Sequence, residues 1–451
     1  GDAIEFLKEV DSMTYIEAIK YLGEKYGVEI NENDSNYQFN NEKESLLILL
    51  NKSMMFFREN LETEEGKNIA LTYFNHRKIS KDMIEKFQLG YSLDKWDSLY
   101  NYLIKNKFDE DQILKAGLIL ENKNKKYDRF RNRVIFPIHN LSGKTIAFGA
   151  RIISEEKNQP KYINSPETSL YIKSNILYGL YQSKNIIRKA NNCYLVEGYT
   201  DVISLFQIGI ENVVASSGTS LTINQIKLIS RYTKNITILY DGDKAGISAS
   251  LRGMDLILEN DMNVKIVSFP EGEDPDSFSK RVGKQKFEEF IDANETNLIS
   301  FKVKLLDKYK NDSVKKSEMI FDIVRSISKI PNSIKRSVFL KEASNSLEIN
   351  EQALISEMNK LLIGKGSKII QSNNLIDKKE KGSERDDSIN SAINFYEREC
   401  IRMLVNYGTT DFEVIGLDRK SFIDYFLNEI EDVEFENKNY LKIIDVFKKE
   451  Y

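Results

Sequence analysis

Cysteine and histidine are almost absent from this 451-residue sequence, which contains two of each. Cys193 and Cys400 lie far apart in the chain, so they can form neither a disulfide framework nor a four-thiolate zinc site. His76 and His139 leave almost nothing for a histidine-based metal site. We therefore expect no zinc in this chain, and we expect a reducing, cytoplasmic compartment.

Long apolar runs are also missing. The longest, such as residues 46–50 and 236–240, fall far short of the ~20 residues that a membrane-spanning helix requires, so we expect a soluble chain without a membrane partner. The 65 basic and 69 acidic residues leave a formal net charge of −4, which gives no sign of a nucleic-acid partner when it is averaged over the chain. The length of 451 residues suggests roughly two to four domains, and the 41% of hydrophobic residues are enough to bury their cores. The chain begins with Gly1 and has no signal-peptide pattern, which predicts a fragment of a longer protein.

Helical periodicity dominates the first part of the chain. Apolar residues recur at helical spacing from residue 1 to about 30, with a break near Asp11 and Ser12. The polar stretch 31–41 has no period and is interpreted as a loop. Residues 44–116 are predicted to be helical throughout.

The last part of the chain is also predicted to be mainly helical. Residues 286–362 have helical spacing. The segment 364–390 is rich in Gly, Lys, Asp and Ser and has few apolar residues, which favours an interdomain linker. A last helical segment is predicted from about Ile393 to the end.

The middle of the chain is patterned as strands. Residues 134–138 and 145–149 are short β-like runs joined by a turn at 141–144, which predicts a β-hairpin. From residue 192 onward strands and helices alternate, which predicts an α/β fold with a parallel sheet and covering helices. The expected units are strand 193–196, helix 201–207, strand 212–215, helix 222–232, strand 236–240, helix 245–259 and strand 264–269.

Acidic residues follow three of these predicted strands. Glu197 comes after the first strand, Asp241 and Asp243 after the third, and Asp274 and Asp276 after the fourth. The carboxyl ends of parallel strands meet at one crevice, so these carboxylates are expected to converge there. Such a cluster repels itself without cations, and Mg²⁺ or Mn²⁺ held by carboxylate oxygens is the natural compensation. The pattern favours metal-dependent phosphate chemistry.

Each acidic motif has a simpler interpretation when it is taken alone. Asp-Gly-Asp after a strand is often only a turn, because Asp and Gly tolerate the backbone dihedrals that turns require. Three acidic motifs at the ends of three different strands are much harder to obtain by chance.

A second feature is a basic strip over residues 123–173, where eleven basic and four acidic side chains leave a local charge of +7. Arg129, Arg131 and Arg133 alternate along a segment predicted to be extended, so we expect them on one face, with Phe130 on the other. A row of guanidinium groups suits phosphate oxygens. The alternative is a solvated charged face, which we favour for the lysines at 123–126.

Several segments resemble known families. Residues 197–201, 215–219, 240–246 and 272–278 resemble the TOPRIM domain, which bacterial primases share with type IA and type II topoisomerases and some nucleases. The upstream segments 127–138, 146–151, 160–168 and 177–180 are similar to the N-terminal half of the RNA polymerase domain of bacterial replicative DNA primases. The match is collinear over roughly residues 40–300.

The resemblance implies a TOPRIM-type parallel sheet, preceded by a mixed α+β subdomain and followed by helical subdomains. The expected parts are 1–40, the helical tail of a missing zinc-binding module with a linker; 41–190, the α+β subdomain with the basic strip; 191–285, the TOPRIM domain; 286–363, a helical subdomain; 364–390, a linker; and 391–451, the start of a helicase-interacting domain.

The resemblance also implies a DNA primase, which makes short RNA primers on single-stranded DNA from ribonucleoside triphosphates. Two or more Mg²⁺ or Mn²⁺ ions would be held by Glu197, Asp241 and Asp243, with Asp201, Asp274 and Asp276 as outer or second-ion ligands. Glu197 could also assist as a general base. The residues assigned to the nucleotide and template side are Arg129, Arg131, Arg133, Arg151, Lys161, Asn164 and Lys173.

Further partners follow from the resemblance. We expect the replicative helicase to bind the C-terminal region, a single-stranded DNA-binding protein to be a second partner, and the core to be a monomer. Two other classes stay open, a TOPRIM topoisomerase or nuclease and a non-catalytic scaffold. The first would need a different upstream module, and the intact set of carboxylates disfavours the second.

Overall fold

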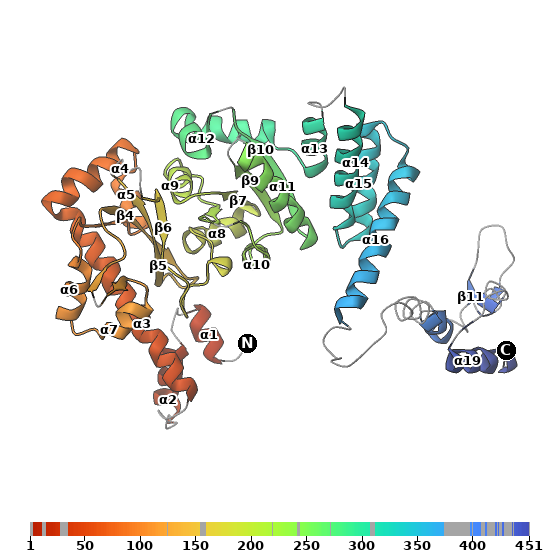
Figure 1. Ribbon diagram of the computed structural model, residues 1–451, viewed down its shortest axis with the longest axis horizontal. Helices are drawn as coiled ribbons and strands as arrows, with labels where there is room; N and C mark the ends of the chain where they lie inside the picture. Colours follow the sequence, from red (N-terminus) through yellow and green to blue (C-terminus); the bar gives the residue numbers. More distant parts are fainter. Residues whose placement is uncertain are drawn as a thin grey trace. The chain divides into compact units, whose positions relative to one another are not determined.

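A computed structural model describes residues 3–10, 15–27, 35–123, 125–153, 159–218, 220–240, 244–270, 272–306, 312–373 and parts of 397–450. The chain forms two compact units, residues 1–358 and 359–451. Both a parallel and an antiparallel sheet lie in the first unit (Figure 1), so the predicted α/β class is confirmed. Among the described residues, no helix combines the length and the apolar content that crossing a bilayer would require.

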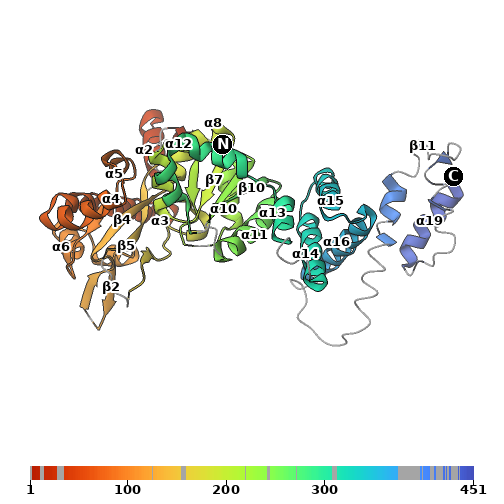
Figure 2. The same cartoon turned by 90° about the horizontal axis from the view of Figure 1, so that it is seen from above.

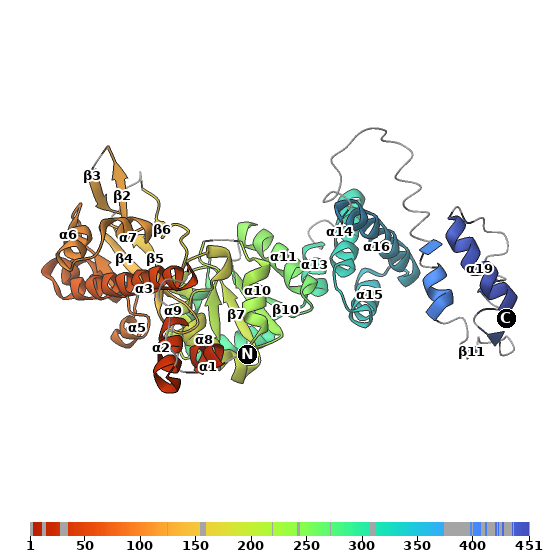
Figure 3. The same ribbon diagram turned by 90° about the horizontal axis from the view of Figure 1, so that it is seen from below.

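The predicted hairpin is confirmed and lies at the centre of an antiparallel sheet. Strands β4 (Arg133–His139) and β5 (Thr145–Ile152) pair across it, and the strand order is β1-β4-β5-β6. The edge strands are β1 (Gly90–Ser92) and β6 (Tyr162–Asn164). A separate ribbon of β2 (Ile119–Asn122) and β3 (Lys125–Asp128) projects from this region in Figures 2 and 3.

Both faces of this sheet are covered, which explains why all seven residues of β4 are buried. Ile135 packs into a core with Phe57 of helix α3, which lies across the sheet in Figure 3. Phe136 points to the other face and packs with residues of the parallel sheet. The alternation of side chains along a strand therefore divides one apolar run between two cores.

Helices precede the central hairpin of the antiparallel sheet. They are α1 (Ala3–Val10), α2 (Tyr15–Tyr26), α3 (Ser35–Glu59), the 3₁₀ turn η1 (Asn60–Glu62), the π-helix η2 (Gly66–Leu71), α4 (Thr72–His76), α5 (Lys81–Lys86), α6 (Ser98–Lys105) and α7 (Glu110–Lys115). The predicted break near Asp11 and Ser12 lies outside the described residues.

Two predictions for this region are wrong. The predicted loop 31–41 overlaps α3, which begins at Ser35. This stretch has neither Pro nor Gly, so a helix can propagate into it from the amphipathic segment that follows. The predicted continuous helix 44–116 is interrupted by β1, whose three residues pair with β4. Such a short strand is fixed by tertiary pairing and leaves no period in the sequence.

The predicted alternation of strands and helices is confirmed throughout the parallel sheet. The strand order is β10-β9-β7-β8, and all pairs are parallel. The strands are β7 (Cys193–Val196), β8 (Val213–Ala215), β9 (Asn235–Tyr240) and β10 (Asn263–Ser268). The helices are α8 (Leu180–Ala190), α9 (Tyr199–Gln207), α10 (Ile223–Ser230), α11 (Lys244–Glu259) and α12 (Pro275–Asn294), and a short 3₁₀ turn, η3 (Lys173–Asn175), precedes α8. In Figure 1, α9 and α12 lie toward the antiparallel sheet, and α10 and α11 cover the other face.

A helical bundle follows the parallel sheet, as predicted. It contains α13 (Leu298–Leu306), α14 (Ser313–Ser328), α15 (Ser333–Leu347) and α16 (Glu351–Asn373). The predicted linker 364–390 begins inside α16, because glycines in a helix cost only about 1 kcal/mol each and do not have to end it. The rest of that linker lies outside the described residues.

The second unit has its own small apolar core. Ile401, Leu404, Phe426 and Ile444 are among the residues that form it. The unit includes α19 (Lys438–Glu450) and two short antiparallel strands, β11 (Asp411–Phe412) and β12 (Lys420–Ser421). The expectation of helix alone from about Ile393 to the end is therefore wrong.

One aromatic side chain joins the two sheets of the first unit. Tyr199, at the start of α9, is 3% exposed, and its ring stacks on Phe136 of β4 at 5.2 Å between centroids. Gly149 of β5 lies directly opposite Phe136 in the register. A Cβ atom at Gly149 would come within 2.5 Å of the Tyr199 ring, so glycine is required there by close packing.

We predict that Gly149→Ala destabilises the first unit by about 1–3 kcal/mol, because the added methyl group would force Tyr199 away from Phe136. Gly253→Ala is the matched control. Its Cβ atom would meet nothing closer than 3.6 Å, and alanine favours the helix that it would occupy. Urea unfolding of both variants checks the prediction, and wild-type stability of Gly149→Ala would contradict it.

Candidate active site

A cavity of about 750 Å³ lies where the antiparallel sheet meets the carboxyl edge of the parallel sheet. We call it the cleft. Its polar lining comes from both sides: Tyr162 and Asn164 of β6 with nearby Lys161, the segment from Glu197 to Asp201, the start of α12, and Arg77 and Arg252. The cleft is thus built from segments almost 200 positions apart in the sequence.

Four of the predicted carboxylates line the cleft, namely Glu197, Asp201, Asp274 and Asp276. Two of them also accept backbone hydrogen bonds at the start of a helix. Asp201 accepts a hydrogen bond from the Gly198 backbone N–H at 2.9 Å, within the first turn of α9. Asp274 caps α12 and accepts from the Ser277 backbone N–H at 2.7 Å. These caps orient the carboxylates at the ends of strands.

Asp276 has a different environment. It is 3% exposed, forms an ion pair with Arg77 at 2.9 Å, and also contacts Lys280 and the Ser204 hydroxyl, which donates to it. Both carboxylate oxygens therefore already have partners, as a buried charge requires. Arg77 was not foreseen from the sequence, because it follows α4 and lies far from every acidic motif.

Asp241 and Asp243 lie outside the described residues, so their convergence with Glu197 stays a prediction. Strand β9 ends at Tyr240, immediately before them, and pairs in parallel with β7, which ends immediately before Glu197. Among the described residues, no group of three or more Asp, Glu, His or Cys side chains is close enough to hold a metal ion.

The expected alternation of Arg129, Arg131 and Arg133 is wrong. Asn132 has a φ of +48°, which interrupts the extended backbone between the second and third arginine. The Arg133 side chain is buried and donates to the Pro160 carbonyl at 3.0 Å. Arg129 donates to the Asn164 carbonyl at 3.0 Å. The three guanidinium groups therefore have separate local roles.

The other predicted basic and polar residues are distributed around the cleft. Lys161 and Asn164 line it, and the Asn164 side chain accepts from the Tyr199 hydroxyl at 2.8 Å. Arg151 of β5 lies over the Tyr73 ring at 4.7 Å, and its buried Nε has no hydrogen-bond partner in the described part of the chain. Lys173 belongs to η3 and is not among the lining residues.

Arg131 is part of an exposed aromatic group outside the cleft. Its guanidinium lies 3.4 Å from the centroid of Trp96, and Tyr127 meets the same ring edge-on at 5.6 Å. Trp96 is 63% exposed. We call these three residues the stacking platform. The sequence signal that could have identified it was the single tryptophan of the chain, flanked by charged residues in a segment that was interpreted as plain helix.

A buried carboxylate holds the platform in place. Asp128 is 3% exposed and accepts hydrogen bonds from the backbone N–H groups of Leu99 and Tyr100 at 2.7 and 2.9 Å, while its own N–H donates to the Trp96 carbonyl at 2.7 Å. Burial raises the pKa of Asp128 from 3.8 to about 6, because the desolvation of its charged form outweighs these hydrogen bonds.

The comparisons with known proteins match this arrangement. A model of the N-terminal domain of the DNA primase catalytic core matches residues 56–184, and a Toprim-like model matches residues 194–279. A DNA primase of Clostridium acetobutylicum is 36% identical over 415 residues, which cover 90% of this chain and 67% of the relative. The chain belongs to the bacterial DNA primase family. The implied family is thereby confirmed.

Solved primase structures resemble a large part of the chain. The crystal structure of a DNA primase domain from Pseudomonas aeruginosa has a TM-score of 0.64 and 32% identity, covering 70% of this chain and 99% of that one. The DnaG primase catalytic domain bound to single-stranded DNA has a TM-score of 0.63 and 31% identity, covering 69% and 99%. The chain spans 50% to 67% of the length of the first curated primases that it matches. Residues 378–451 match a domain of unknown function.

We predict that the stability of the wild-type chain relative to Asp128→Asn falls as the pH rises from about 4 to about 6. Between the ordinary pKa of 3.8 and the folded-state value of about 6, the folded chain binds more protons than the unfolded chain, so rising pH favours unfolding. The change is at most about 3 kcal/mol. Urea unfolding of both proteins from pH 4.5 to 7.5 measures it, and a difference independent of pH would contradict the raised pKa.

Proposed function

We propose that this primase-family chain synthesises short RNA primers on single-stranded DNA from ribonucleoside triphosphates. The observation that carries the proposal is the cleft, in which carboxylates at the carboxyl edge of a Toprim-like sheet lie opposite cationic and polar groups from the other sheet. Nucleotidyl transfer needs both, because negatively charged phosphates must be held next to an acidic metal-binding edge.

The Toprim-like match implies the use of divalent metal ions, and the carboxylates lining the cleft are donors of the matching chemical type. The described carboxylates alone form no group of three, so the proposed ligand set depends on Asp241 and Asp243. Carboxylate oxygens are the ligands that Mg²⁺ and Mn²⁺ prefer. We assign Glu197, Asp241 and Asp243 as the main ligands, with Asp201, Asp274 and Asp276 in outer positions. Asp276 is outermost, because Arg77, Lys280 and Ser204 already occupy its oxygens. Bound ions would lower the pKa of the attacking 3′-hydroxyl and neutralise charge on the leaving pyrophosphate.

The chain's own cations would bind the triphosphate. Lys161 lines the cleft opposite the carboxylates. Arg77 lines it too, and we assign it a part in phosphate binding beside its ion pair with Asp276. Arg151 has a buried Nε for which the described residues supply no acceptor, and its guanidinium lies over the rings of Tyr73 and Tyr162, so a phosphate oxygen would complete its environment. We keep Lys173 as a residue at the edge of the nucleotide region.

The stacking platform is our candidate for template contact. An exposed tryptophan backed by a guanidinium offers a flat surface on which a base can stack, and stacking is the usual way in which proteins bind single strands without sequence preference. The exposed Lys123 and Lys125 on the adjacent ribbon supply positive charge for the backbone. A related DnaG primase catalytic domain has a solved structure bound to single-stranded DNA, which supports single-stranded DNA as the class of ligand.

The remaining partners are proposed on the family resemblance alone. We assign residues 391–451 to contact with the replicative helicase, and a single-stranded DNA-binding protein as a second partner. The described residues of this region form a small core of their own, which is compatible with a separate binding module.

One assay separates the candidate functions. The chain is incubated with single-stranded DNA, ribonucleotides and Mg²⁺ or Mn²⁺. Short RNA products support the primase, relaxation or cleavage of DNA supports a TOPRIM topoisomerase or nuclease, and a chain without any product would be a scaffold.

We predict that Asp241→Asn abolishes RNA synthesis and leaves binding of single-stranded DNA nearly unchanged, because the substitution removes a metal-binding charge and no template contact. Product gels and fluorescence anisotropy with a labelled oligonucleotide measure the two properties. Asp261→Asn, at the turn after α11, is the matched control and should keep both. Undiminished synthesis by Asp241→Asn would disprove the assignment.

We also predict that Trp96→Ala weakens binding of single-stranded DNA by roughly 5- to 150-fold, the range expected from the loss of about 1–3 kcal/mol of stacking. Trp96→Phe should retain most of the affinity, because it keeps an aromatic face. Phe321→Ala on α14 removes an aromatic side chain that is 40% exposed and should have no effect. Anisotropy titrations at fixed salt make the comparison, and equal affinity of Trp96→Ala and wild type would exclude the platform.

A further inference from the structure

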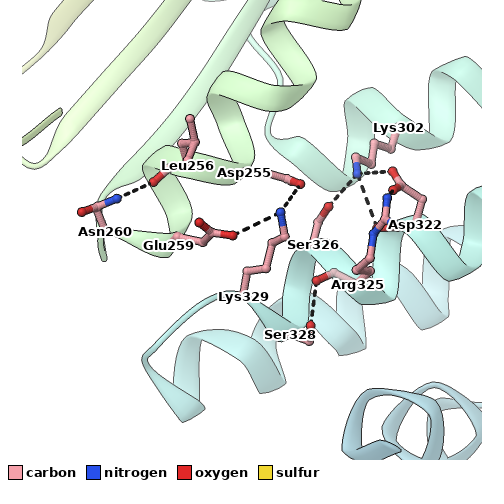
Figure 4. Close-up of polar contacts among 10 residues, drawn as sticks. All are labelled: Asp255, Leu256, Glu259, Asn260, Lys302, Asp322, Arg325, Ser326, Ser328 and Lys329. Atoms are coloured by element: carbon pink, nitrogen blue, oxygen red, sulfur yellow. Dashed lines mark hydrogen bonds and ion pairs between the residues drawn. The ribbon is translucent and has the colours of Figure 1, made fainter. Parts of the chain in front are cut away.

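The helical bundle contacts the parallel sheet through two lysines. Lys329, which follows the last turn of α14, places its Nζ 2.9 Å from Asp255 Oδ2 and 3.1 Å from Glu259 Oε1 (Figure 4). Lys335 of α15 donates to the Met262 carbonyl at 2.9 Å, in the turn between α11 and β10. Both lysines therefore bind the C-terminal half of α11 or the turn after it.

Contacts within the bundle and with strand β10 fix the helices that carry these lysines. Lys302 of α13 is 4% exposed, contacts Asp322 and donates to the Ser326 hydroxyl at 2.6 Å, which ties α13 to α14 (Figure 4). The backbones of Ile266 and Thr296 exchange two hydrogen bonds of 2.9 Å, which tie β10 to the segment before α13. The bundle is thus anchored to the sheet at several points, and Lys329 extends from a fixed support.

Helix α11 is a wall of the cleft. Arg252, Gly253 and Leu256 line the cavity, and Asp255 is their immediate neighbour on the same two turns. The helix starts at Lys244, directly after the segment with Asp241. A change in the rotation or tilt of α11 would therefore move the cleft lining.

The position of α11 depends on Lys329 because two acidic side chains of this helix lie at the contact. Asp255 and Glu259 are four residues apart on one helix, so their like charges repel. Lys329 lies within ion-pair distance of both. The Asp255 side chain is only 16% exposed, and its Oδ1 is buried without a hydrogen-bond partner among the described residues, so removal of the ammonium group would leave a poorly solvated carboxylate.

We propose that Lys329 is a positioning residue for the cleft. It holds α11 in the rotation that presents Arg252 and Leu256 to the bound nucleotide, and so makes the helical bundle part of the catalytic machinery. The inference rests on the proposed function, since it assigns the wall that Lys329 holds to nucleotide binding.

The test compares primer synthesis by Lys329→Met, Lys329→Arg and wild type over a range of ribonucleotide concentrations. Lys329→Met keeps an unbranched side chain that is one atom shorter and removes the charge, and we expect it to raise the KM for ribonucleotides at least threefold with a smaller change in kcat. Lys329→Arg should restore the wild-type KM. Arg325→Met is the matched control, because Arg325 lies on the same helix and its ion pair is with Asp322, within the bundle.

A second variant guards against misfolding of the first. Glu259→Gln removes one of the two acidic partners and leaves Lys329 bound to Asp255, so it should be stable. Added to Lys329→Met, it should lower the KM toward the wild-type value because it removes the repulsion within α11. A wild-type KM in Lys329→Met, or a lowered melting temperature with an unchanged KM, would overturn the inference.

ATP binding measured by equilibrium dialysis separates this inference from the proposed function. If the wild-type chain binds ATP and makes no RNA, the proposed function fails, and the inference is then decided by the ATP affinity alone. A threefold or greater loss in Lys329→Met, reversed in Lys329→Arg, supports it. Equal affinity in the two variants overturns it.

Discussion

The geometry of the cleft depends on one packing contact, the insertion of Tyr199 between the two sheets. Its ring stacks on Phe136 and leaves no space for a side chain at Gly149, and its hydroxyl donates to Asn164 on the wall of the cleft. Because Tyr199 follows Glu197 by two residues, the turn that packs the sheets together also places an acidic side chain. Close-packed aromatic rings resist displacement, so the two walls are held by the core and do not rely on flexible charged side chains.

Charge compensation supplies a second link between the same two parts. Asp276 at the start of α12 is buried against Arg77, which follows α4 on the other side of the cleft, and Lys280 adds another cation to the same carboxylate. A buried carboxylate with two cations is a locally positive group. The acidic edge is therefore not uniform: Glu197 and Asp274 contribute negative charge beside a compensated site, and a phosphate can approach from that side without meeting only carboxylates.

The parallel sheet was predictable because each of its strands is an apolar run with turn residues on both sides. This pattern is visible within a short stretch of sequence. The four described carboxylates could be placed for the same reason, since each follows a strand or begins the helix after it. The sequence did not identify Arg77, Arg252 or Trp96. Their contacts lie across the cleft or on an exposed surface, and contacts of these kinds leave no periodic pattern in the sequence. The strand at residues 90–92 was missed because its pairing with β4 is what makes it a strand.

The segment from Asp128 to Arg133 shows why a basic run is not by itself a binding surface. Asp128 holds the start of α6, Arg129 bonds the backbone of β6, and Arg133 is buried against the carbonyl of Pro160. Only Arg131 lies against an exposed ring. Guanidinium groups serve in this way because one planar group can satisfy several carbonyls that would otherwise be buried without a donor. The basic residues of such a segment can therefore either hydrogen-bond irregular backbone or bind phosphate. The contacts of each side chain decide which of the two roles it has.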